Sequence, residues 1–277
     1  MPELPEVETI RRDLEPHLLG NRVTALWTSG KSLRLKRPVD DSRIRNLALG
    51  RCIDGIRRVA KYLLLDLEGG GVLVFHLGMS GRMQLAGADT LRALHAHVAL
   101  ALDSGTELRF VDPRRFGLVV PTTRGEVLSL PELASLGVDP LGPELTAERL
   151  HDMTKRARCP VKAFLLDQSR VAGIGNIYAC EALFEAKIHP MTPADRLSMR
   201  RVARLREAIV LVLQRGITNR GTTLRDYVDG QGVQGNNQHS LRVYGREAQA
   251  CPREDGGQVR RAVTSGRSTY YCTSCQK

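Results

Sequence analysis

Residues 61–78 read KYLLLDLEGGGVLVFHLG, and this stretch decides the fold class of the first half of the chain. Two apolar runs surround three consecutive glycines, which is the pattern of two strands joined by a tight turn. Residues 97–112, HVALALDSGTELRFVD, repeat this pattern around residues 103–106. Because successive hairpins tend to pair into antiparallel sheets, we expect an all-β region that extends to about residue 125.

A helix is expected before these strands, within MPELPEVETIRRDLEPHLLG. Its apolar residues recur at helical spacing, and Gly20 is placed to end it. These apolar residues are Val7, Ile10, Leu14 and Leu18. The helix therefore begins almost at the amino terminus, where acidic residues complement the partial positive charge of the free N–H groups.

The second half of the chain is expected to be mainly helical. After a proline-containing stretch that resembles a linker, Pro160 is placed at the start of a short helix that runs to Leu166. Residues 173–186, GIGNIYACEALFEA, read as a glycine turn into a second helix. A longer amphipathic helix is marked by Val202, Leu205, Ile209, Val212 and Leu213. Residues 220–240 are rich in Gly, Asn and Gln, and so long a polar loop is more typical of a functional segment than of a core.

The charge balance indicates a polyanionic partner. Lys and Arg number 41 against 30 Asp and Glu, which gives a net charge of +11. A surplus of that size usually meets nucleic acid. The first twenty residues carry charges throughout, and no apolar run reaches the roughly 18 residues of a membrane span. We therefore expect a cytoplasmic protein with no membrane contact, and the six cysteines fit a reducing compartment.

The last thirty residues carry a candidate metal site. Cys272 and Cys275 have the spacing with which two thiolates of one turn bind zinc, and Cys251 lies about twenty residues upstream. A four-cysteine site would need a second cysteine beside Cys251, but the sequence there is ACPRED. Asp255 or Glu254 is thus the candidate fourth ligand of a zinc ion. A β-hairpin without metal is the alternative.

Eight segments, spread in order over nearly the whole chain, carry a resemblance to a known family. They are PELPEVET (2–9), RRVAKYLLLDL (57–67), HLGMSGR (76–82), DPRRFG (112–117), GIGNIYACEALF (173–184), GTTLRDYV (221–228), VYGRE (243–247) and RSTYYCTSCQK (267–277). With these segments the chain resembles the bacterial formamidopyrimidine-DNA glycosylases. The resemblance implies a bifunctional base-excision repair enzyme that removes oxidised purines, notably 8-oxoguanine and formamidopyrimidines, and then cuts the strand. The implied partner is damaged double-stranded DNA, bound by a monomer.

The resemblance also implies the fold, which is α+β. Residues 1–125 are expected to form the catalytic helix and a β-sandwich. Residues 126–240 are expected to form a helix-two-turn-helix domain with a base-capping loop, and residues 241–277 a zinc-finger-like β-hairpin. This layout agrees with the order of elements that the hydrophobic patterns predict.

The amino terminus carries the expected catalytic pair. Removal of Met1 would leave Pro2 with a free secondary amine, and α-amino groups with a pKa of about 8 are partly unprotonated and nucleophilic at neutral pH. Attack of this amine on the sugar C1′ gives a cationic iminium, which makes the adjacent sugar proton acidic and permits elimination. By the resemblance, Glu3 is the acid that assists ring opening and Glu6 a second carboxylate that acts through water. Glu8 is taken as a solvated helix residue.

Two basic residues complete the expected catalytic set. Lys61, placed inside the apolar strand that begins at residue 57, resembles the lysine that contacts phosphate and assists β-elimination. Arg267 corresponds to the hairpin arginine that contacts phosphate beside the lesion and assists δ-elimination.

Three residues are expected to fill the space left by an extruded base, because a glycosylase must take its target out of the stack. Met79, Arg114 and Phe116 match the void-filling residues of the family. Core positions are the alternative for Met79 and Phe116. The glycines beside Met79 and the arginines beside Phe116 indicate exposed turns.

Further DNA contacts follow from the same resemblance. Asn176 resembles a phosphate-binding asparagine at a helix start, and His95 a DNA-contacting histidine, whereas His97 reads equally well as a packed strand residue. The family's usual basic position falls on Ala157, so the neighbouring Arg158, with Arg156, is the candidate there. In the capping loop, relatives commonly carry an aromatic residue where this chain has residues 235–237, Gly-Asn-Asn.

Two alternatives remain for the function. An endonuclease VIII-like relative would prefer oxidised pyrimidines, although Leu4 and GTTLRDY favour the purine enzyme because that relative typically has glycine at the fourth position. A non-catalytic protein that binds damaged DNA would keep the basic surface and a degenerate hairpin.

Overall fold

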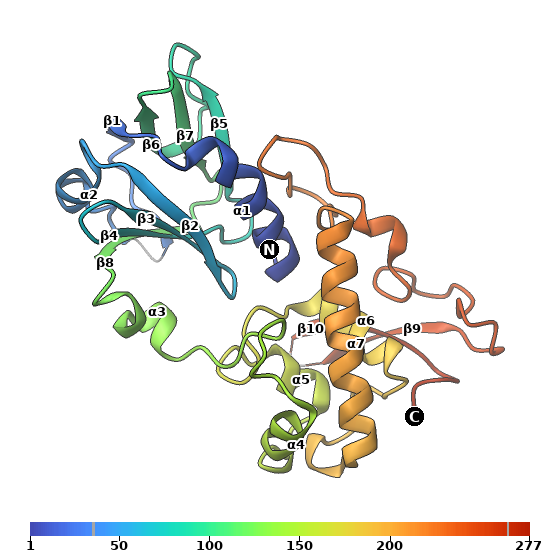
Figure 1. Ribbon diagram of the computed structural model, residues 1–277. Helices are drawn as coiled ribbons and strands as arrows, with labels where there is room; N and C mark the ends of the chain where they lie inside the picture. Colours follow the sequence, from blue (N-terminus) through green and yellow to red (C-terminus); the bar gives the residue numbers. More distant parts are fainter. Residues whose placement is uncertain (35–36, 265) are drawn as a thin grey trace. The chain divides into compact units, whose positions relative to one another are not determined.

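The structure is a computed structural model that describes residues 1–34, 37–264 and 266–277. The chain forms two compact units (Figure 1). Unit 1 consists of Met1–Ala134 and Asn219–Asn236, and unit 2 of Ser135–Thr218 and Asn237–Lys277. The expected three-part division of the chain remains a prediction.

Unit 1 contains two four-stranded antiparallel sheets and two main helices. Its helices are α1 (Leu4–Leu18), α2 (Asp41–Ala48) and the short α3 (Pro131–Ala134). One sheet has the order β1-β6-β7-β5, formed by Val23–Thr28, Ala96–Leu102, Thr106–Val111 and Arg82–Gly87. The other has the order β2-β3-β4-β8, formed by Ile53–Val59, Tyr62–Leu67, Gly71–His76 and Leu118–Thr123. Phe75 of β4 and Phe110 of β7 lie 6.1 Å apart between ring centroids, so the two sheets share one apolar core.

The two expected hairpins are confirmed. β3 pairs with β4 in the register Tyr62↔His76, and β6 pairs with β7 in the register Leu100↔Leu108. The placement of Lys61 inside a strand is wrong: β2 ends at Val59 and β3 begins at Tyr62, so Lys61 lies in the turn between them. Ala60, its neighbour in this turn, has a φ of 52°. The hydrophobic patterns did not predict α2, because its surface-facing residues leave few apolar positions.

The expected first helix is also confirmed. α1 ends at Leu18, and Gly20 follows with a φ of 77°, a backbone conformation that glycine adopts without strain. The apolar stripe is fully covered at Val7, Ile10, Leu14 and Leu18. Burial of each such side chain contributes on the order of 2 kcal/mol relative to exposure, so the stripe fixes the helix on the sheets.

The prediction that Glu8 is solvated is wrong. Its carboxylate accepts hydrogen bonds from Arg12 Nε at 2.8 Å and Arg58 Nε at 3.2 Å, and Arg11 pairs with it at 3.1 Å. Partial burial acts to raise the pKa of Glu8, but these three guanidinium groups outweigh it and hold the pKa below its ordinary value. Arg58 belongs to β2, so Glu8 joins the helix to the sheet, a contact that helical spacing alone does not reveal.

Residues 219–236 fold against α1 within unit 1. Arg220 donates to Asp13 of α1 at 2.7 Å, and Gly230 N–H donates to the same carboxylate at 3.1 Å. A Cβ added at Gly235 would lie 2.2 Å from the carbonyl oxygen of Gly221, so only glycine fits this close approach. The segment is therefore an ordered loop, although its composition is polar.

Unit 2 combines helices with the carboxyl-terminal hairpin. Its helices are α4 (Ala147–Lys155), α5 (Val161–Leu166), α6 (Asn176–Glu185) and α7 (Met199–Thr218), and its strands are β9 (Val259–Thr264) and β10 (Arg267–Cys272). The predicted helices after Pro160 and Gly175 and the long amphipathic helix are confirmed, with every predicted apolar position of α7 buried. The sequence patterns did not predict α4.

A buried carboxylate anchors the segment that leads to the hairpin. Glu181 of α6 accepts three backbone N–H bonds, from Arg242 at 2.8 Å, Val243 at 3.0 Å and Tyr244 at 2.9 Å. One charged acceptor thereby satisfies three donors that would otherwise be buried without partners.

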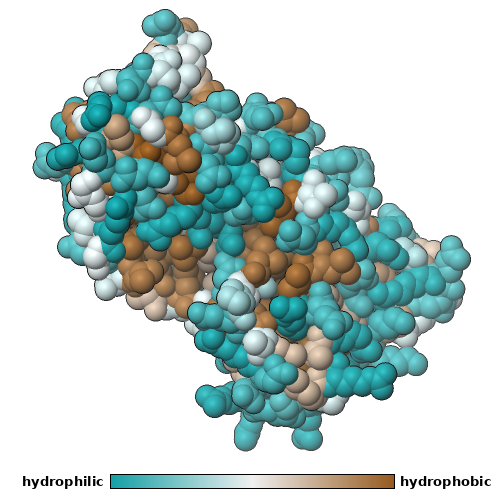
Figure 2. Space-filling model, in the orientation of Figure 1, coloured by the Kyte–Doolittle hydropathy of each residue, from teal (hydrophilic) through white to brown (hydrophobic). Residues whose placement is uncertain are grey.

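The outer face drawn in Figure 2 is mostly hydrophilic, with apolar patches between the charged side chains. The exposed large apolar residues include Leu91, Leu94, Leu128 and Val263. None of the helices in the described part of the chain has the length and apolar character to cross a bilayer.

Candidate functional site

The start of α1 positions the predicted amino-terminal pair. Pro2 is buried, and Glu3, 4% exposed, is the N-cap of the helix. Glu3 and Glu6 form a capping box, in which the Glu3 N–H donates to Glu6 Oε2 at 2.8 Å. The reciprocal bonds satisfy the backbone N–H groups of Glu3 and Glu6, so the residue that follows Pro2 is held at the helix start.

Glu6 also reaches a distant part of the chain. Its second oxygen, Oε1, accepts the N–H of Thr222 at 2.7 Å. The carboxylate, 2% exposed, therefore joins the first turn of α1 to the segment 219–236. Both of its oxygens are engaged with backbone donors, so Glu6 is held in one orientation.

Lys61 lies near a histidine that the sequence reasoning missed. Lys61 is 6% exposed in the β2–β3 turn. His76 ends β4, its ring lies 4.7 Å from that of Tyr62, and its Nδ1 accepts the N–H of Gly78 at 3.0 Å. Burial, followed by the positive charges of Arg34 and Lys61, lowers the pKa of His76 to about 4. His76 is thus neutral at pH 7, which its bond from Gly78 requires.

Met79, Arg114 and Phe116 lie on two exposed turns, as predicted from their neighbours. Met79 is 44% exposed and Phe116 47% exposed, so neither is a core side chain. The Arg114 guanidinium lies over the Phe116 ring, 4.6 Å from its centroid. Unit 1 thus exposes two apolar side chains and one cationic side chain on these turns.

One buried aspartate holds both turns together. Asp112 accepts Ser80 Oγ at 2.7 Å through Oδ1 and the N–H of Gly117 at 2.7 Å through Oδ2. A Cβ at Gly78 would lie 2.5 Å from the carbonyl carbon of Phe116, so the two turns meet backbone to backbone. Met79 and Phe116 are thereby brought to adjacent loops. The sequence DPRRFG indicated an exposed turn, but it did not reveal that its aspartate bonds Ser80 of the other turn.

The two histidines of the β6 region differ in environment. His95 is exposed in the turn before β6. His97 is 2% exposed, with Nδ1 at 3.0 Å from Ser29 Oγ and Nε2 at 3.0 Å from the carbonyl oxygen of Asp112. The alternative that His97 is a packed strand residue is confirmed.

In unit 2, two of the side chains predicted to contact DNA, Arg267 and Asn176, lie at the start of β10. Arg267 is the first residue of β10 and is exposed. Asn176, the first residue of α6, donates from Nδ2 to the carbonyl oxygen of Ser268 at 2.9 Å, and buried Lys162 donates to the same oxygen at 3.1 Å. Both residues fix the backbone next to Arg267, a contact that the sequence reasoning did not predict. Arg158 is exposed.

The carboxyl-terminal cysteines and one carboxylate form a candidate metal centre. Ligand atoms of Cys251, Asp255, Cys272 and Cys275 all lie within 4.8 Å of one another. Glu254, the other candidate, has a φ of 56° in the turn and lies outside this cluster. A tetrahedral site with metal–sulfur bonds of about 2.3 Å needs ligand atoms about 3.8 Å apart, which this cluster approaches.

The surroundings of the sulfurs suit a bound cation. The N–H of Arg253 points at Cys251 Sγ at 3.5 Å and the N–H of Ser274 at Cys272 Sγ at 3.3 Å. N–H donors favour thiolate over thiol, whereas burial without a cation raises the pKa of Cys275 to about 12. The four donors thus fit a divalent metal ion, which would supply the positive charge that three thiolates need.

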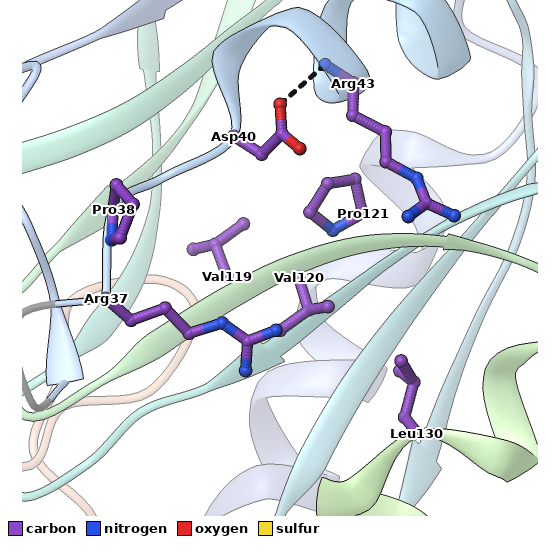
Figure 3. A pocket seen from close by; sticks show the side chains of 8 residues that line it. All are labelled: Arg37, Pro38, Asp40, Arg43, Val119, Val120, Pro121 and Leu130. Carbon is purple, nitrogen blue, oxygen red and sulfur yellow. Dashed lines mark hydrogen bonds between the residues drawn. The ribbon is translucent and has the colours of Figure 1, made fainter.

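A pocket between α2 and β8 has, among its described lining residues, no unpaired arginine that would attract an anion (Figure 3). It has a volume of about 350 Å³ and an apolar floor that includes Val119 and Val120. Arg37 pairs with Glu132, and Arg43 pairs with Glu126 at 2.8 Å. Asp40 accepts the N–H of Arg43 at 3.0 Å and caps α2. Each cation at this pocket therefore has its own carboxylate.

Family models define the class of this two-unit fold. Residues 1–119 match the formamidopyrimidine-DNA glycosylase N-terminal domain, and residues 136–228 match the formamidopyrimidine-DNA glycosylase H2TH domain. The chain belongs to the formamidopyrimidine-DNA glycosylase family.

Curated relatives and solved structures agree with this assignment. A formamidopyrimidine-DNA glycosylase of Desulforamulus reducens is 45% identical over 277 residues, which are 100% of this chain and 99% of the relative. One from Xanthomonas campestris pv. campestris is 43% identical, with full coverage of both chains. The crystal structure of the MutM (Fpg) protein from Thermus thermophilus is 40% identical with a TM-score of 0.87, and covers 99% of this chain and 98% of its own. The Lactococcus lactis Fpg in complex with DNA containing an abasic site has 30% identity and a TM-score of 0.90, with 99% of each chain covered.

We expect Asp112→Asn to loosen both turns. An amide can accept through only one of its two atoms, so either Ser80 or Gly117 loses its acceptor. The unmade bond should lower the free energy of unfolding by about 1 to 3 kcal/mol, measured by urea denaturation. Asp103→Asn is the control, because Asp103 accepts one bond, from the Arg22 N–H, in an exposed turn. Equal stability of Asp112→Asn and the wild type would contradict the role of Asp112.

We expect stability to decline on acidification because of His76. Its folded pKa of about 4 lies below the ordinary value of 6.5, so the unfolded chain binds the extra proton first. The contribution of neutral His76 to the free energy of unfolding is complete above pH 6.5. It is lost as the pH falls towards 4, by up to about 3 kcal/mol. Chemical unfolding between pH 7.5 and 4.5 measures it. His76→Gln should flatten the profile, and His17→Gln, at an exposed site, should not. Parallel profiles for wild type and His76→Gln would refute this assignment.

Proposed function

We infer that the protein is a bifunctional base-excision repair enzyme. It removes oxidised purines, 8-oxoguanine and formamidopyrimidines, from double-stranded DNA and then cuts the strand at the abasic site. The observation that carries this proposal is the buried start of α1. There, the consecutive residues Pro2 and Glu3 lie within a domain that matches this family. Support comes from related Lactococcus lactis structures that contain Fapy-dG DNA or abasic DNA. We place it in the bacterial cytoplasm, acting as a monomer.

The chemistry starts from the amine of Pro2 after removal of Met1. The nitrogen attacks the sugar C1′, the bond from C1′ to the base breaks, and the base leaves with the bonding electrons and a proton. Glu3 donates a proton to the ring oxygen as the sugar opens, which yields the iminium cation. This cation draws electrons from C2′, so loss of a C2′ proton expels the 3′ phosphate.

Basic residues assist the two eliminations. Lys61 contacts a phosphate at the lesion and assists β-elimination, and Arg267 contacts phosphate from the hairpin and assists δ-elimination. The firm anchoring of the β10 start by Asn176 and Lys162 supports a positioned Arg267, because a mobile arginine would lose more side-chain entropy on binding.

The remaining assigned residues bind the duplex. Met79, Arg114 and Phe116 enter the space of the extruded nucleotide, with Met79 and Phe116 as apolar wedges and Arg114 as the group that hydrogen-bonds the orphaned base. His95 and Arg158 contact the DNA, and Asn176 binds a phosphate. Glu6 acts at the lesion through water. The exposure of the first three on adjacent turns supports this assignment.

The proposed metal is one zinc ion bound by Cys251, Cys272, Cys275 and Asp255. Its chemistry is structural: a closed four-ligand site cross-links the base of the hairpin. A hairpin of two strands is marginal in water by itself, so the cross-link would keep Arg267 in place.

Borohydride trapping tests the amine mechanism. We expect the protein, incubated with duplex that contains 8-oxoguanine opposite cytosine, to yield a covalent adduct. Trypsin cleaves after Arg11, so the adduct should map to peptide 2–11, which begins at Pro2. An adduct on the peptide that contains Lys61 would contradict the assignment of Pro2. Efficient trapping only with thymine glycol would favour the pyrimidine enzyme, and binding without any adduct a non-catalytic protein.

Two variants sharpen this experiment. Pro2→Gly should strongly reduce the trapped adduct while duplex binding persists, because a glycine imine is not obligatorily cationic. Glu3→Gln should nearly abolish base release without loss of binding. Glu15→Gln, on the exposed side of the same helix, is the matched control.

We expect Asp255→Asn to lower the affinity for zinc about tenfold or more, since it removes a charged ligand. Glu254→Gln removes the same charge from the neighbouring residue and should leave affinity unchanged, while Asp255→Cys should retain the metal. Elemental analysis and competition with a chelator measure these outcomes. Active wild-type protein without zinc, or a Glu254→Gln variant that loses it, would overturn the ligand assignment.

A further inference from the structure

A second arginine-lined pocket lies in unit 2. It has a volume of about 310 Å³ and is lined by Arg215, His239, Ser240, Leu241, Arg242 and Arg246. Arg215 is in the last turn of α7, and the other residues follow one another from the short 3₁₀ helix Asn237–Ser240 onward. Neither the chemistry proposed above nor its DNA contacts use these residues.

The positive charge of this pocket is only partly balanced. Arg215 pairs with Glu185 at 3.4 Å, but Glu185 also pairs with Arg253 at 2.8 Å. Within the described ranges, Arg242 and Arg246 form no ion pair with any carboxylate. Arg246 Nε donates to the neutral amide of Gln249 at 2.8 Å, and Arg242 donates to the carbonyl oxygen of Pro252 at 3.2 Å.

One side of the pocket is anchored, and one of its donors has no acceptor. Glu181 accepts the backbone N–H groups of Arg242 and of the two residues that follow it. The Arg242 guanidinium lies 5.8 Å from the Phe184 ring centroid. Its Nε is buried without a hydrogen-bond partner in the structure, and such donors are rare in native proteins unless a ligand or water completes them.

The pocket in Figure 3 provides the contrast. There, Arg37 and Arg43 each have their own glutamate, Glu132 and Glu126. Both pockets are of similar size, yet only the pocket in unit 2 has guanidinium groups held by neutral acceptors. Of these two pockets, the one in unit 2 is therefore the one in which two guanidinium groups have no carboxylate partner among the described residues.

We propose that the pocket lined by Arg215, Arg242 and Arg246 binds a phosphate group. A guanidinium fork matches two phosphate oxygens, and a phosphate supplies both the negative charge and the several acceptors that the pocket lacks. The exposed His239 and the hydroxyl of Ser240 line the same space. The phosphate belongs either to a DNA backbone or to a small phosphate compound. The inference does not rest on the proposed glycosylase chemistry.

The test uses the full-length, ¹⁵N-labelled wild-type protein. Inorganic phosphate is titrated at constant ionic strength, and the Nε–Hε signals of Arg242, Arg246 and, as a control, Arg43 are followed by NMR. We expect saturable shifts for Arg242 and Arg246 and none for Arg43. Shifts that chloride reproduces, or that do not saturate, would overturn the proposal. Because the wild type is observed directly, this result does not depend on the folding of a variant.

A variant then separates the two sources of phosphate. Arg242→Gln should lose the saturable response at Arg246, while Arg43→Gln keeps it, and thermal unfolding of both confirms the fold. If the pocket holds DNA backbone, Arg242→Gln lowers the slope of log affinity against log salt for duplex by about 1. If it holds a small phosphate compound, the slope stays unchanged although the phosphate response is lost. A retained response in Arg242→Gln would contradict the site.

Discussion

The carboxylate of Glu6 is the interaction on which the amino-terminal site depends. With one oxygen it accepts the N–H of Glu3, and with the other the N–H of Thr222. These donors are more than 200 residues apart in the chain. Charged acceptors form hydrogen bonds roughly twice as strong as neutral ones, so this side chain caps the start of α1 and, together with Asp13, holds the segment 219–236 against the helix. The segment 219–236 is thus tied to the helix end that carries the proposed nucleophile.

The same physical solution recurs at two other points. Asp112 joins the Met79 turn to the Phe116 turn, and Glu181 holds residues 242–244 before the hairpin. In each case a buried carboxylate satisfies N–H or O–H donors of loops that regular secondary structure cannot pair. The two turns joined by Asp112 present Met79, Arg114 and Phe116, which we assign to DNA, so a buried acid orders this surface although the protein is basic overall. The arginine pocket of unit 2 is the converse case, since Arg242 and Arg246 lack such partners in the described part of the chain.

Local patterns were sufficient for much of the fold. The spacing of Val7, Ile10 and Leu14 predicted α1, the glycine turns predicted the β3–β4 and β6–β7 hairpins, and the apolar stripe predicted α7. Errors arose where charge was interpreted locally. The prediction that Glu8 is solvated is wrong because Arg58 comes from β2 and pairs with it. Lys61 was placed within a strand because its flanks are apolar, whereas it lies in the turn that joins two strands. The neutral state of His76 depends on its burial and on its neighbours Gly78, Tyr62 and Lys61. The spacing of residues in the sequence does not reveal that these groups come together.

The sequence by itself determined the family, the elements and the kinds of residue available for chemistry, because periodicity, turn glycines and motif order are local properties. It also supplied three cysteines and two candidate carboxylates for a metal. Only the tertiary structure decided that Asp255 rather than Glu254 joins the cysteines, since the left-handed turn at Glu254 places the next residue in the cluster. It likewise decided that Met79 and Phe116 meet on adjacent turns and that Glu6 reaches Thr222. Such pairings depend on which distant donors share a buried space, and this is fixed only when the chain has packed.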